Sequence, residues 1–251
     1  MISKERIKKI RALHQKKQRE LTQEMLVEGT KSCLEVWNSS LEIVSTYVTQ
    51  DWIDKMDGKL PINIDYEIIS QREMGQISAL STPPEVLSVV KIPQYNAAQF
   101  DSQQPILVLD AIRDPGNLGT IIRSADWFGI RQIFCSEDCV EFSNPKVIQA
   151  TMGSFCRVKI VYGDIAELIQ NQADRATYGM FLEGKLLREV NFEKNSLIIV
   201  GNESEGISKK VEQLIEYKVH IPTGSGAAGA ESLNASVATG ILLYELSTQQ
   251  H

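Results

Sequence analysis

The chain has 251 residues, of which 43% are hydrophobic and 23% are charged, and its formal net charge is −6. This length and composition suit a globular protein with one large or two smaller domains. No apolar run approaches the roughly 20 residues that span a bilayer, and the N-terminus lacks the apolar segment of a secretory signal, so we expect a cytoplasmic protein without a membrane partner.

The N-terminus is basic although the whole chain is acidic. Its basic residues are Lys4, Arg6, Lys8, Lys9, Arg11, Lys16, Lys17 and Arg19. The net charge argues against a protein that coats nucleic acid indiscriminately, but a local cluster of this kind can bind phosphate by counterion release. A solvated basic helix face explains the same residues equally well, and both interpretations stay open.

The chain up to Pro93 predicts a small mixed α/β unit. Ile7, Ile10 and Leu13 recur on one side of a helix expected over 3–19. The other elements expected here are a helix over 22–37, strands over 41–48, 66–70 and 85–91, and a short helix over 75–80. The next segment, YNAAQFDSQQ, is polar and lacks apolar periodicity, so it is interpreted as a linker. The predicted domains are therefore 1–94 and 105–251, joined by a linker at 95–104.

Beyond Pro105, short apolar strands alternate with helices. The expected strands cover 106–109, 132–135, 157–161, 177–182, 197–200 and 218–221, and the expected helices cover 118–128, 145–152, 165–170, 208–214 and 232–246. This alternation indicates an α/β domain with a buried, largely parallel sheet. Ligands of such sheets bind at the carboxyl ends of the strands, so the loops found there are the candidates for a functional site.

The cysteines do not predict a metal site. Cys33, Cys135, Cys139 and Cys156 contain no C-x-x-C pair, and no histidine lies at zinc-finger spacing from Cys135 and Cys139. We expect buried or idle thiols, no disulfide framework and no bound metal.

The first candidate loop, DAIRDPGNLG, leads into the helix expected over 118–128. Asn117 is placed to cap that helix, Gly129 to end it, and Arg123 to lie near the carboxyl end of the strand. Taken alone, this stretch is explained as a capped helix with one solvent-facing arginine.

The second candidate loop follows the strand LIIV and reads GNESEG. It lacks the lysine and glycine pattern of a phosphate loop, which also argues against a nucleotide-binding enzyme. Glu203 and Glu205 would repel phosphate and suit a ligand with a cationic or hydroxyl-rich end. A hydrolase is disfavoured because no partner histidine or metal set accompanies the two carboxylates.

The third candidate loop runs from Ile221 to Ser236 and is rich in glycine. Ser232 is placed to cap the closing helix, on which Leu233, Val237, Ile241 and Tyr244 recur on one face. A glycine-rich loop that is capped into a helix is weak evidence by itself.

Together and in this order, the three loops resemble the motifs of the SpoU (TrmH-type) family of RNA 2′-O-ribose methyltransferases, in the SPOUT superfamily. The matching stretches are DPGNLGTIIRSADWFG, IIVGNESEGIS and IP…ESLNASVATGILLYE, within about 105–246, and NPKVIQATMGS between the first two is also similar to a family segment. The resemblance implies a parallel-sheet domain with a deep trefoil knot, S-adenosylmethionine as cofactor and a homodimer.

The N-terminal stretches LVEGTKSCLEV and LSTPPEVLSVV resemble the ribosomal-protein-like RNA-binding domain that precedes many of these enzymes, although Glu85 stands where the family usually has glycine. The resemblance thereby implies an RNA substrate-binding domain over 1–94. This domain favours ribosomal RNA as the substrate. A tRNA substrate and a catalytically idle RNA-binding or ribosome-assembly protein remain as alternatives, since phosphate contacts position an RNA without revealing its sequence.

The resemblance also assigns site residues. Those implied for catalysis are Asn117, Arg123, Glu203, Ser232 and Asn234, and those implied for the cofactor are Gly201, Asn202, Ile221, Pro222 and Leu233. The family gives Arg123 the activation of the nucleophile. Because a guanidinium is a donor only, we expect Arg123 to orient the 2′-hydroxyl and hold a neighbouring phosphate. The stretch GSGAAGA makes the third loop longer than in familiar members of the family, next to Ile221 and Leu233.

Overall fold

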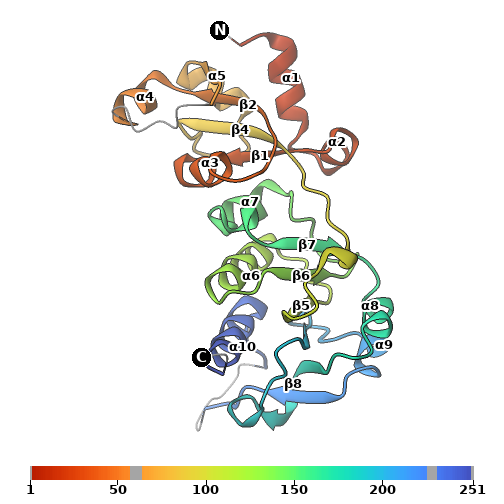
Figure 1. Cartoon of the computed structure of the whole chain (residues 1–251). Helices are drawn as coiled ribbons and strands as arrows, with labels where there is room; N and C mark the ends of the chain where they lie inside the picture. The colour runs from red at the N-terminus through yellow and green to blue at the C-terminus, as the bar shows by residue number, and fades with distance from the viewer. Residues whose placement is uncertain (1, 57–63, 225–230, 250–251) are drawn as a thin grey trace. The chain divides into compact units, whose positions relative to one another are not determined.

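The computed structural model describes residues 2–56, 64–224 and 231–249, and its contacts divide the chain into two units (Figure 1). Unit 1 consists of Met1–Gln94 together with Glu141–Cys156, and unit 2 of Tyr95–Val140 together with Arg157–His251. Within the described residues, no helix is both long and apolar enough to cross a membrane.

Unit 1 is built on a four-stranded mixed sheet. Its strands are β1 (Glu24–Glu28), β2 (Ile43–Val48), β3 (Glu67–Ile68) and β4 (Val86–Lys91), in the order β1-β4-β2-β3. β4 runs antiparallel to β1 and β2, whereas the short β3 is parallel to β2. The expected small mixed α/β unit is confirmed.

Helices complete the core of unit 1. They are α1 (Lys4–Ala12), α2 (Lys16–Thr22), α3 (Thr30–Trp37), α4 (Gln50–Met56), α5 (Gln71–Ile77) and α7 (Pro145–Thr151), with a 3-10 turn at Ser154–Cys156. Apolar side chains from α1, α5 and the sheet, among them Ile10, Met74 and Leu87, form one buried cluster. Burial of these side chains supplies the main driving force for this unit.

The expectation of one helix over 3–19 is wrong, because the chain turns between α1 and α2. The turn frees backbone carbonyls, and the side chain of Arg19 satisfies two of them: its Nη1 donates to the carbonyl oxygens of Leu13 (2.8 Å) and His14 (3.0 Å). Arg19 is itself buried and forms an ion pair with Glu141. The break therefore depends on tertiary contacts, and no glycine or proline marks it in the sequence.

The helix expected over 22–37 is also wrong in its first half, which forms β1. Met25, Leu26 and Val27 are all buried in the sheet, and consecutive apolar residues fit a strand buried on both faces as well as a helix. Gly29, with φ +89°, separates the strand from α3. This left-handed conformation favours glycine.

Two helices of unit 1 differ from the sequence prediction in position. The helix expected over 75–80 is α5, which starts at Gln71 behind a capping box made by Ser70 and Glu73. α4 was not predicted at all; its Trp52 is buried and donates through Nε1 to Thr30 Oγ1 at 2.8 Å. In both cases the apolar pattern was too short to set the bounds.

Residues 141–156 belong to unit 1 by their contacts, although they lie inside the range 105–251 that was predicted as one domain. α7 packs against β1 in this unit. Gly153 adopts φ +93°, and a Cβ there would lie 2.5 Å from Glu35 Cγ. Glycine is thus required for the close approach of this segment to α3.

Unit 2 contains a six-stranded sheet in which every neighbouring pair is parallel. The strands are β5 (Ile106–Leu109), β6 (Gln132–Cys135), β7 (Lys159–Tyr162), β8 (Thr177–Leu186), β9 (Leu197–Val200) and β10 (Tyr217–His220), in the order β10-β8-β9-β5-β6-β7. The expected parallel-sheet α/β fold is confirmed, and β5 and β9 are fully buried.

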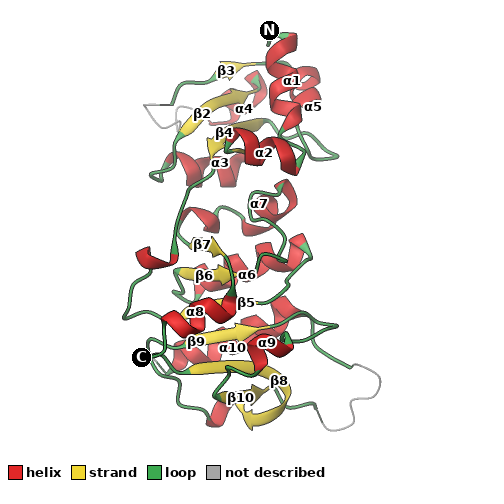
Figure 2. Ribbon diagram, turned by 90° about the vertical axis from the view of Figure 1, so that its right-hand side faces the viewer, coloured by secondary structure: helices red, strands yellow, loops and turns green. Residues whose placement is uncertain are grey.

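Helices cover both faces of this sheet. α6 (Pro115–Trp127) and α10 (Ala235–Thr248) pack together on one face, and α8 (Ile165–Asn171) and the short α9 (Lys209–Glu212) lie on the other (Figures 1 and 2). Short 3-10 turns occupy Ala97–Gln99 and Leu187–Glu189. The segment 95–104, predicted as a linker, packs Tyr95 and Phe100 against the core of unit 2.

The sheet order brings two of the candidate loops together. β5 and β9 are parallel neighbours with Leu109 opposite Val200, so the chain leaves both strands at the same edge. The first contact beyond them joins the backbone N–H of Asp110 to the Val200 carbonyl at 2.9 Å. β5 is also where the strand order reverses, which is the position at which open parallel sheets bind ligands.

Candidate active site

The first loop, between β5 and α6, is fixed by Asp114. This residue is the N-cap of α6, and its Oδ1 accepts from the backbone N–H of Asn117 at 2.8 Å. Asn117 was predicted to cap α6, and that prediction is wrong: Asn117 lies in the first turn, after Pro115 at the start of the helix. Because Asp114 performs the capping, the side chain of Asn117 is available to other loops.

Asn117 joins the three loops through its side-chain amide. Its Nδ2 donates to Glu203 Oε1, and its Oδ1 accepts from Nδ2 of Asn234 at 2.8 Å. The same Glu203 oxygen accepts from the backbone N–H of Ala235 at 3.2 Å. One carboxylate and two amides therefore connect the ends of β5 and β9 to the start of α10.

The second loop is a tight turn that depends on Gly201. Asn202 and Gly206 form a two-way backbone bridge, with N···O distances of 3.1 and 2.9 Å. A Cβ on Gly201 would lie 2.4 Å from the Gly206 carbonyl oxygen, so only glycine fits. Asn202 Oδ1 accepts from the N–H groups of Ser204 (2.8 Å) and Glu205 (3.1 Å), and its Nδ2 donates to Ala111 O at 3.0 Å.

Residues that were not singled out in the sequence also shape the first loop. Asp110 is buried and accepts from the backbone N–H of Ser208 at 2.8 Å, which ties the end of β5 to the second loop. Ala111 has φ +57°, an unusual conformation for a residue with a Cβ. Arg113 pairs with Glu205 at 3.2 Å, and this carboxylate raises the pKa of Arg113. Of these residues, Asp110 could have been found from the sequence, because an aspartate directly after a buried strand indicates a site residue.

The third loop reaches the second loop and then enters α10. Ser232 Oγ donates to the Glu203 carbonyl oxygen at 3.3 Å. Ser232 was predicted to cap the closing helix, which is wrong: the N-cap is Asn234, whose Oδ1 accepts from the N–H groups of Ser236 (3.0 Å) and Val237 (3.3 Å). α10 consequently starts at Ala235, later than expected.

The remaining predicted residues take no part in this hydrogen-bond network. Arg123 is exposed on α6, and its guanidinium binds no other side chain within the described part of the chain. Ile221 is half-buried after β10, Pro222 is exposed, and Leu233 is 45% exposed although it is apolar. Most of the stretch GSGAAGA, residues 225–230, lies outside the described residues.

The buried thiol of Cys139 contacts the backbone of the first loop. Cys139 Sγ accepts from the backbone N–H of Ile112 at 3.2 Å and lies 3.3 Å from Leu109 O. A hydrogen bond from Cys135 is the largest of the contacts that lower the pKa of Cys139 to about 7, whereas burial raises the pKa of Cys135. No group of metal-binding side chains occurs among the residues that the structure describes.

One face of unit 2 exposes large apolar side chains on its two packed helices. Trp127 at the end of α6 is 84% exposed, and Val237, Ile241 and Tyr244 on α10 are 51%, 36% and 56% exposed. Tyr244 contacts Phe128 edge to face at 6.5 Å. The predicted one-sided pattern on the closing helix is present for Val237, Ile241 and Tyr244, whereas Leu233 precedes α10. These side chains are exposed, and the core holds Leu242, Leu243 and Leu246 instead.

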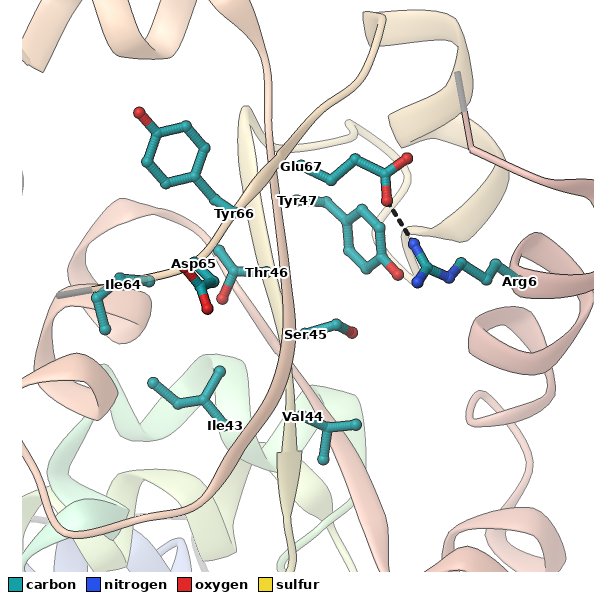
Figure 3. A pocket seen from close by; sticks show the side chains of 10 residues that line it. All are labelled: Arg6, Ile43, Val44, Ser45, Thr46, Tyr47, Ile64, Asp65, Tyr66 and Glu67. Carbon is teal, nitrogen blue, oxygen red and sulfur yellow. Dashed lines mark hydrogen bonds and ion pairs between the residues drawn. The ribbon is translucent and has the colours of Figure 1, made fainter.

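Unit 1 contains a separate cavity of about 390 Å³ (Figure 3). It opens beside the part of β2 that β3 does not reach, since β3 pairs only with Tyr47 and Val48. Its lining consists of Arg6, Ile43, Val44, Ser45, Thr46, Tyr47, Ile64, Asp65, Tyr66 and Glu67. The guanidinium of Arg6 points to Glu67 and pairs with it at 2.6 Å (Figure 3), so the charge of this arginine is already opposed.

Comparison with known proteins matches two family descriptions to different ranges of the chain. Residues 104–244, more than half of the chain, match the SpoU rRNA Methylase family, and residues 4–88 match an MRM3-like substrate binding domain. The chain is 27% identical over 245 residues to the 23S rRNA (guanosine(2553)-2′-O)-methyltransferase RlmP of Bacillus subtilis, covering 96% of each protein.

Two solved structures show the same fold over nearly the whole chain. One is a putative RNA methyltransferase of the TrmH family from Porphyromonas gingivalis, with a TM-score of 0.84, 30% identity and 98% of both chains covered. The other is an AdoMet-bound rRNA methyltransferase from Sinorhizobium meliloti, with a TM-score of 0.86 and 26% identity, covering 100% of this chain and 96% of that one. With the sheet and the three connected loops, these matches show that the chain belongs to the SpoU rRNA methylase family.

Proposed function

We propose that this chain transfers a methyl group from S-adenosylmethionine to a ribose 2′-hydroxyl of ribosomal RNA. The observation that carries the proposal is the network of Asn117, Glu203 and Asn234, which joins the three family motifs at the carboxyl edge of the sheet. The Bacillus subtilis relative is named for 2′-O-methylation of 23S rRNA, and the Sinorhizobium meliloti structure contains the cofactor. The alternative of an idle RNA-binding protein gives no reason to keep this network.

The second and third loops fit S-adenosylmethionine. Gly201 lets the chain double back on Gly206, which leaves loop backbone groups for an adenine and a methionine moiety. Exposed or half-buried apolar side chains, Ile221, Pro222 and Leu233, offer a surface for the adenine ring. Gly201, Asn202, Ile221, Pro222 and Leu233 would hold the cofactor, which supplies an already activated methyl group.

Arg123 is the residue proposed to position the nucleophile. Its guanidinium is exposed and unpaired among the described residues, so all its donors remain available to RNA. A guanidinium donates hydrogen bonds in a fixed fork and does not accept a proton. Arg123 therefore orients the ribose 2′-hydroxyl and holds the adjacent phosphate, which can accept the proton, and catalysis comes mainly from alignment.

Asn117, Glu203, Ser232 and Asn234 are proposed to keep the three loops in register. Glu203 receives hydrogen bonds from Asn117 and from the backbone of Ala235, and Ser232 donates to its carbonyl oxygen. Membership of the family implies a trefoil knot in this region. The contact between Ser232 and Glu203 joins the two loops that such a knot brings together. Displacement of either loop would separate cofactor and ribose.

The exposed face formed by Trp127, Val237, Ile241 and Tyr244 supports a homodimer. Large exposed apolar side chains on two packed helices are typical of an interface between subunits. A two-fold dimer would place this face against the same face of a second copy. The finer assignments of an RNA-binding domain over 1–94, a linker over 95–104, a methyltransferase domain over 105–251 and a cytoplasmic location belong to the same proposal.

The experiment that tests the proposed function measures transfer of labelled methyl groups from S-adenosylmethionine. The substrates are transcripts of the 23S rRNA, 16S rRNA and tRNA genes of the source organism. We expect incorporation into 23S rRNA and, after nuclease digestion, a 2′-O-methylated nucleoside. Incorporation only into tRNA would replace the substrate, and saturable cofactor binding without any transfer would support the idle RNA-binding alternative.

A further inference from the structure

The structure sorts seven of the eight N-terminal basic residues into two groups, and the eighth, Lys17, is exposed on α2 and belongs to neither. The first group is engaged within unit 1: Arg6 pairs with Glu67 at 2.6 Å, Lys9 with Glu5 at 2.9 Å and Lys16 with Glu20 at 3.7 Å. Arg19 is buried and pairs with Glu141. Each of these four cations therefore has a carboxylate partner within unit 1.

The second group lies on α1 and consists of Lys4, Lys8 and Arg11. All three are exposed, and their side chains form no hydrogen bond or ion pair with any residue that the structure describes. Their spacing of four and three residues places them within about 60° of one another on the helix, along about 10 Å of its length. We call these three residues the basic stripe.

The basic stripe faces away from the fold. Ile7 and Ile10 on the same helix contact the core of unit 1, and the side chain of Arg6 points to Glu67 beside the cavity (Figure 3). Helical geometry puts Ile10 and Arg6 on other sides of α1 than the stripe, and Ile7 at the border next to Arg11. The three cations are therefore presented to solvent on one edge of the unit.

The stability of α1 accounts for Arg11, a cation in the last turn of the helix, but not for Lys4 and Lys8. Lys4 is the first residue of the helix, where a cation opposes the positive end of the helix dipole. Lys4 and Lys8 are also like charges four residues apart, a spacing that destabilises a helix. An anionic partner would offset both effects, because it would neutralise the charges that repel one another.

We infer that the basic stripe binds the phosphate backbone of the RNA substrate. This inference rests on the proposed function. It is supported by the match of residues 4–88 to a substrate binding domain, since that match includes all of α1. The chain as a whole carries a net charge of −6, so an RNA has to be attracted by a local surface. Three cations in a row contact phosphates and carry no sequence preference.

The test compares two triple variants with equal changes in net charge. The stripe variant is Lys4→Gln, Lys8→Gln and Arg11→Gln. The control variant is Lys9→Gln, Lys16→Gln and Arg6→Gln, which removes cations that are already paired. Filter binding of a 23S rRNA transcript is measured for the wild-type chain and both variants between 50 and 200 mM KCl, and circular dichroism verifies that each chain is folded.

Each lost phosphate contact reduces the slope of log K against log[salt] by about 0.7 to 0.9. The stripe variant should therefore bind more weakly at low salt. Over this salt range the wild-type chain should lose about 20- to 40-fold more affinity than the stripe variant. The control should follow the wild type. Equal losses in both variants would show that only net charge matters, and no change in either would place the RNA elsewhere; both results overturn the inference.

Methyl transfer distinguishes this inference from the proposed function. If the stripe acts in RNA binding, the stripe variant raises KM for RNA, while kcat at saturating RNA and the affinity for S-adenosylmethionine stay unchanged. A wild-type chain that binds rRNA through the stripe but transfers no methyl group would leave the inference intact and refute the proposed function. If the wild type, the stripe variant and the control variant all methylate rRNA with the same KM, the proposed function stands and the inference about the stripe is refuted.

Discussion

The side-chain amide of Asn234 donates a 2.8 Å hydrogen bond to Oδ1 of Asn117, a residue 117 positions earlier in the chain. The side-chain Nδ2 of Asn117 in turn donates a hydrogen bond to Oε1 of Glu203. Since each residue belongs to a different loop, the bond fixes the start of α10 relative to the start of α6. The geometry of the candidate site consequently depends on side chains from all three motifs.

Replacement of Asn117 by alanine should lower kcat about 100-fold, because small displacements of reacting groups have effects of this size. The half-buried Glu203 carboxylate loses one donor but keeps the N–H of Ala235, so stability should fall by about 1–3 kcal/mol. Methyl transfer under saturating substrates measures the first effect and urea unfolding the second. Asn191→Ala, on an exposed asparagine outside the site, should match the wild type; normal turnover of the Asn117 variant would contradict the role.

Replacement of Arg123 by alanine should abolish measurable turnover without a change in cofactor affinity. The side chain is exposed and forms no hydrogen bond or ion pair with the described parts of the second and third loops, so its loss should leave the proposed cofactor site intact. Calorimetric titration of S-adenosylmethionine and a methyl-transfer assay separate the two effects. Arg123→Lys keeps the charge but not the planar fork and should remain strongly impaired. Near-normal methylation by the alanine variant would refute this assignment.

Replacement of Gly201 by alanine should weaken binding of S-adenosylmethionine at least about 10-fold. The added Cβ would lie 2.4 Å from the Gly206 carbonyl oxygen, and the second loop has to move to relieve this overlap. The matched control is Gly75→Ala in α5 of unit 1, where a Cβ meets only Pro83 Cγ at 3.5 Å. Calorimetry should give wild-type affinity for the control. Equal affinities for both variants would show that the turn can accommodate a side chain.

The stability of the chain should rise between pH 7 and pH 9 through Cys139. Its pKa is about 7 in the folded chain, below the ordinary value of 9.0, so the unfolded chain binds more protons in this interval and stability increases with pH. The contribution is about 2–3 kcal/mol, present above pH 9 and lost as the pH falls through 7. Urea unfolding at several pH values should show this rise in the wild type and a smaller one in Cys139→Ser. Parallel curves would exclude Cys139 as its source.

A charge on the exposed face of α10 should separate the proposed dimer. Ile241→Glu and Tyr244→Glu place a carboxylate among apolar side chains that a second copy would bury, and burial of an unpaired charge is strongly unfavourable. Sedimentation equilibrium should detect dimers for the wild type and monomers for these variants. Leu182→Glu provides the control, because Leu182 is 76% exposed on β8, outside the set of exposed residues on α6 and α10. A monomeric wild-type chain would remove the basis for the dimer.

The sequence predicted unit 2 well because its signals are local. Buried parallel strands such as 106–109 and 197–200 are short apolar runs bounded by loops, and the structure has both with the expected bounds. The order of the three motifs also identified the family without any knowledge of their contacts. Unit 1 was harder, since Met25–Val27 fits a helix or a buried strand equally well, and only pairing with β4 decides between them.

The sequence by itself determined the family, the parallel sheet and the set of polar residues in the three loops. The tertiary structure decided which neighbours those residues have: Asp114 and Asn234 cap the helices in place of Asn117 and Ser232. It likewise decided that Arg19 is buried whereas Lys4, Lys8 and Arg11 are exposed. The caps themselves are local contacts, since Asp114 and Asn234 each accept from backbone N–H groups two or three residues later. The links from Asn117 to Glu203 and Asn234, and from Arg19 to Glu141, join segments remote in sequence, and such contacts exist only after the chain has folded.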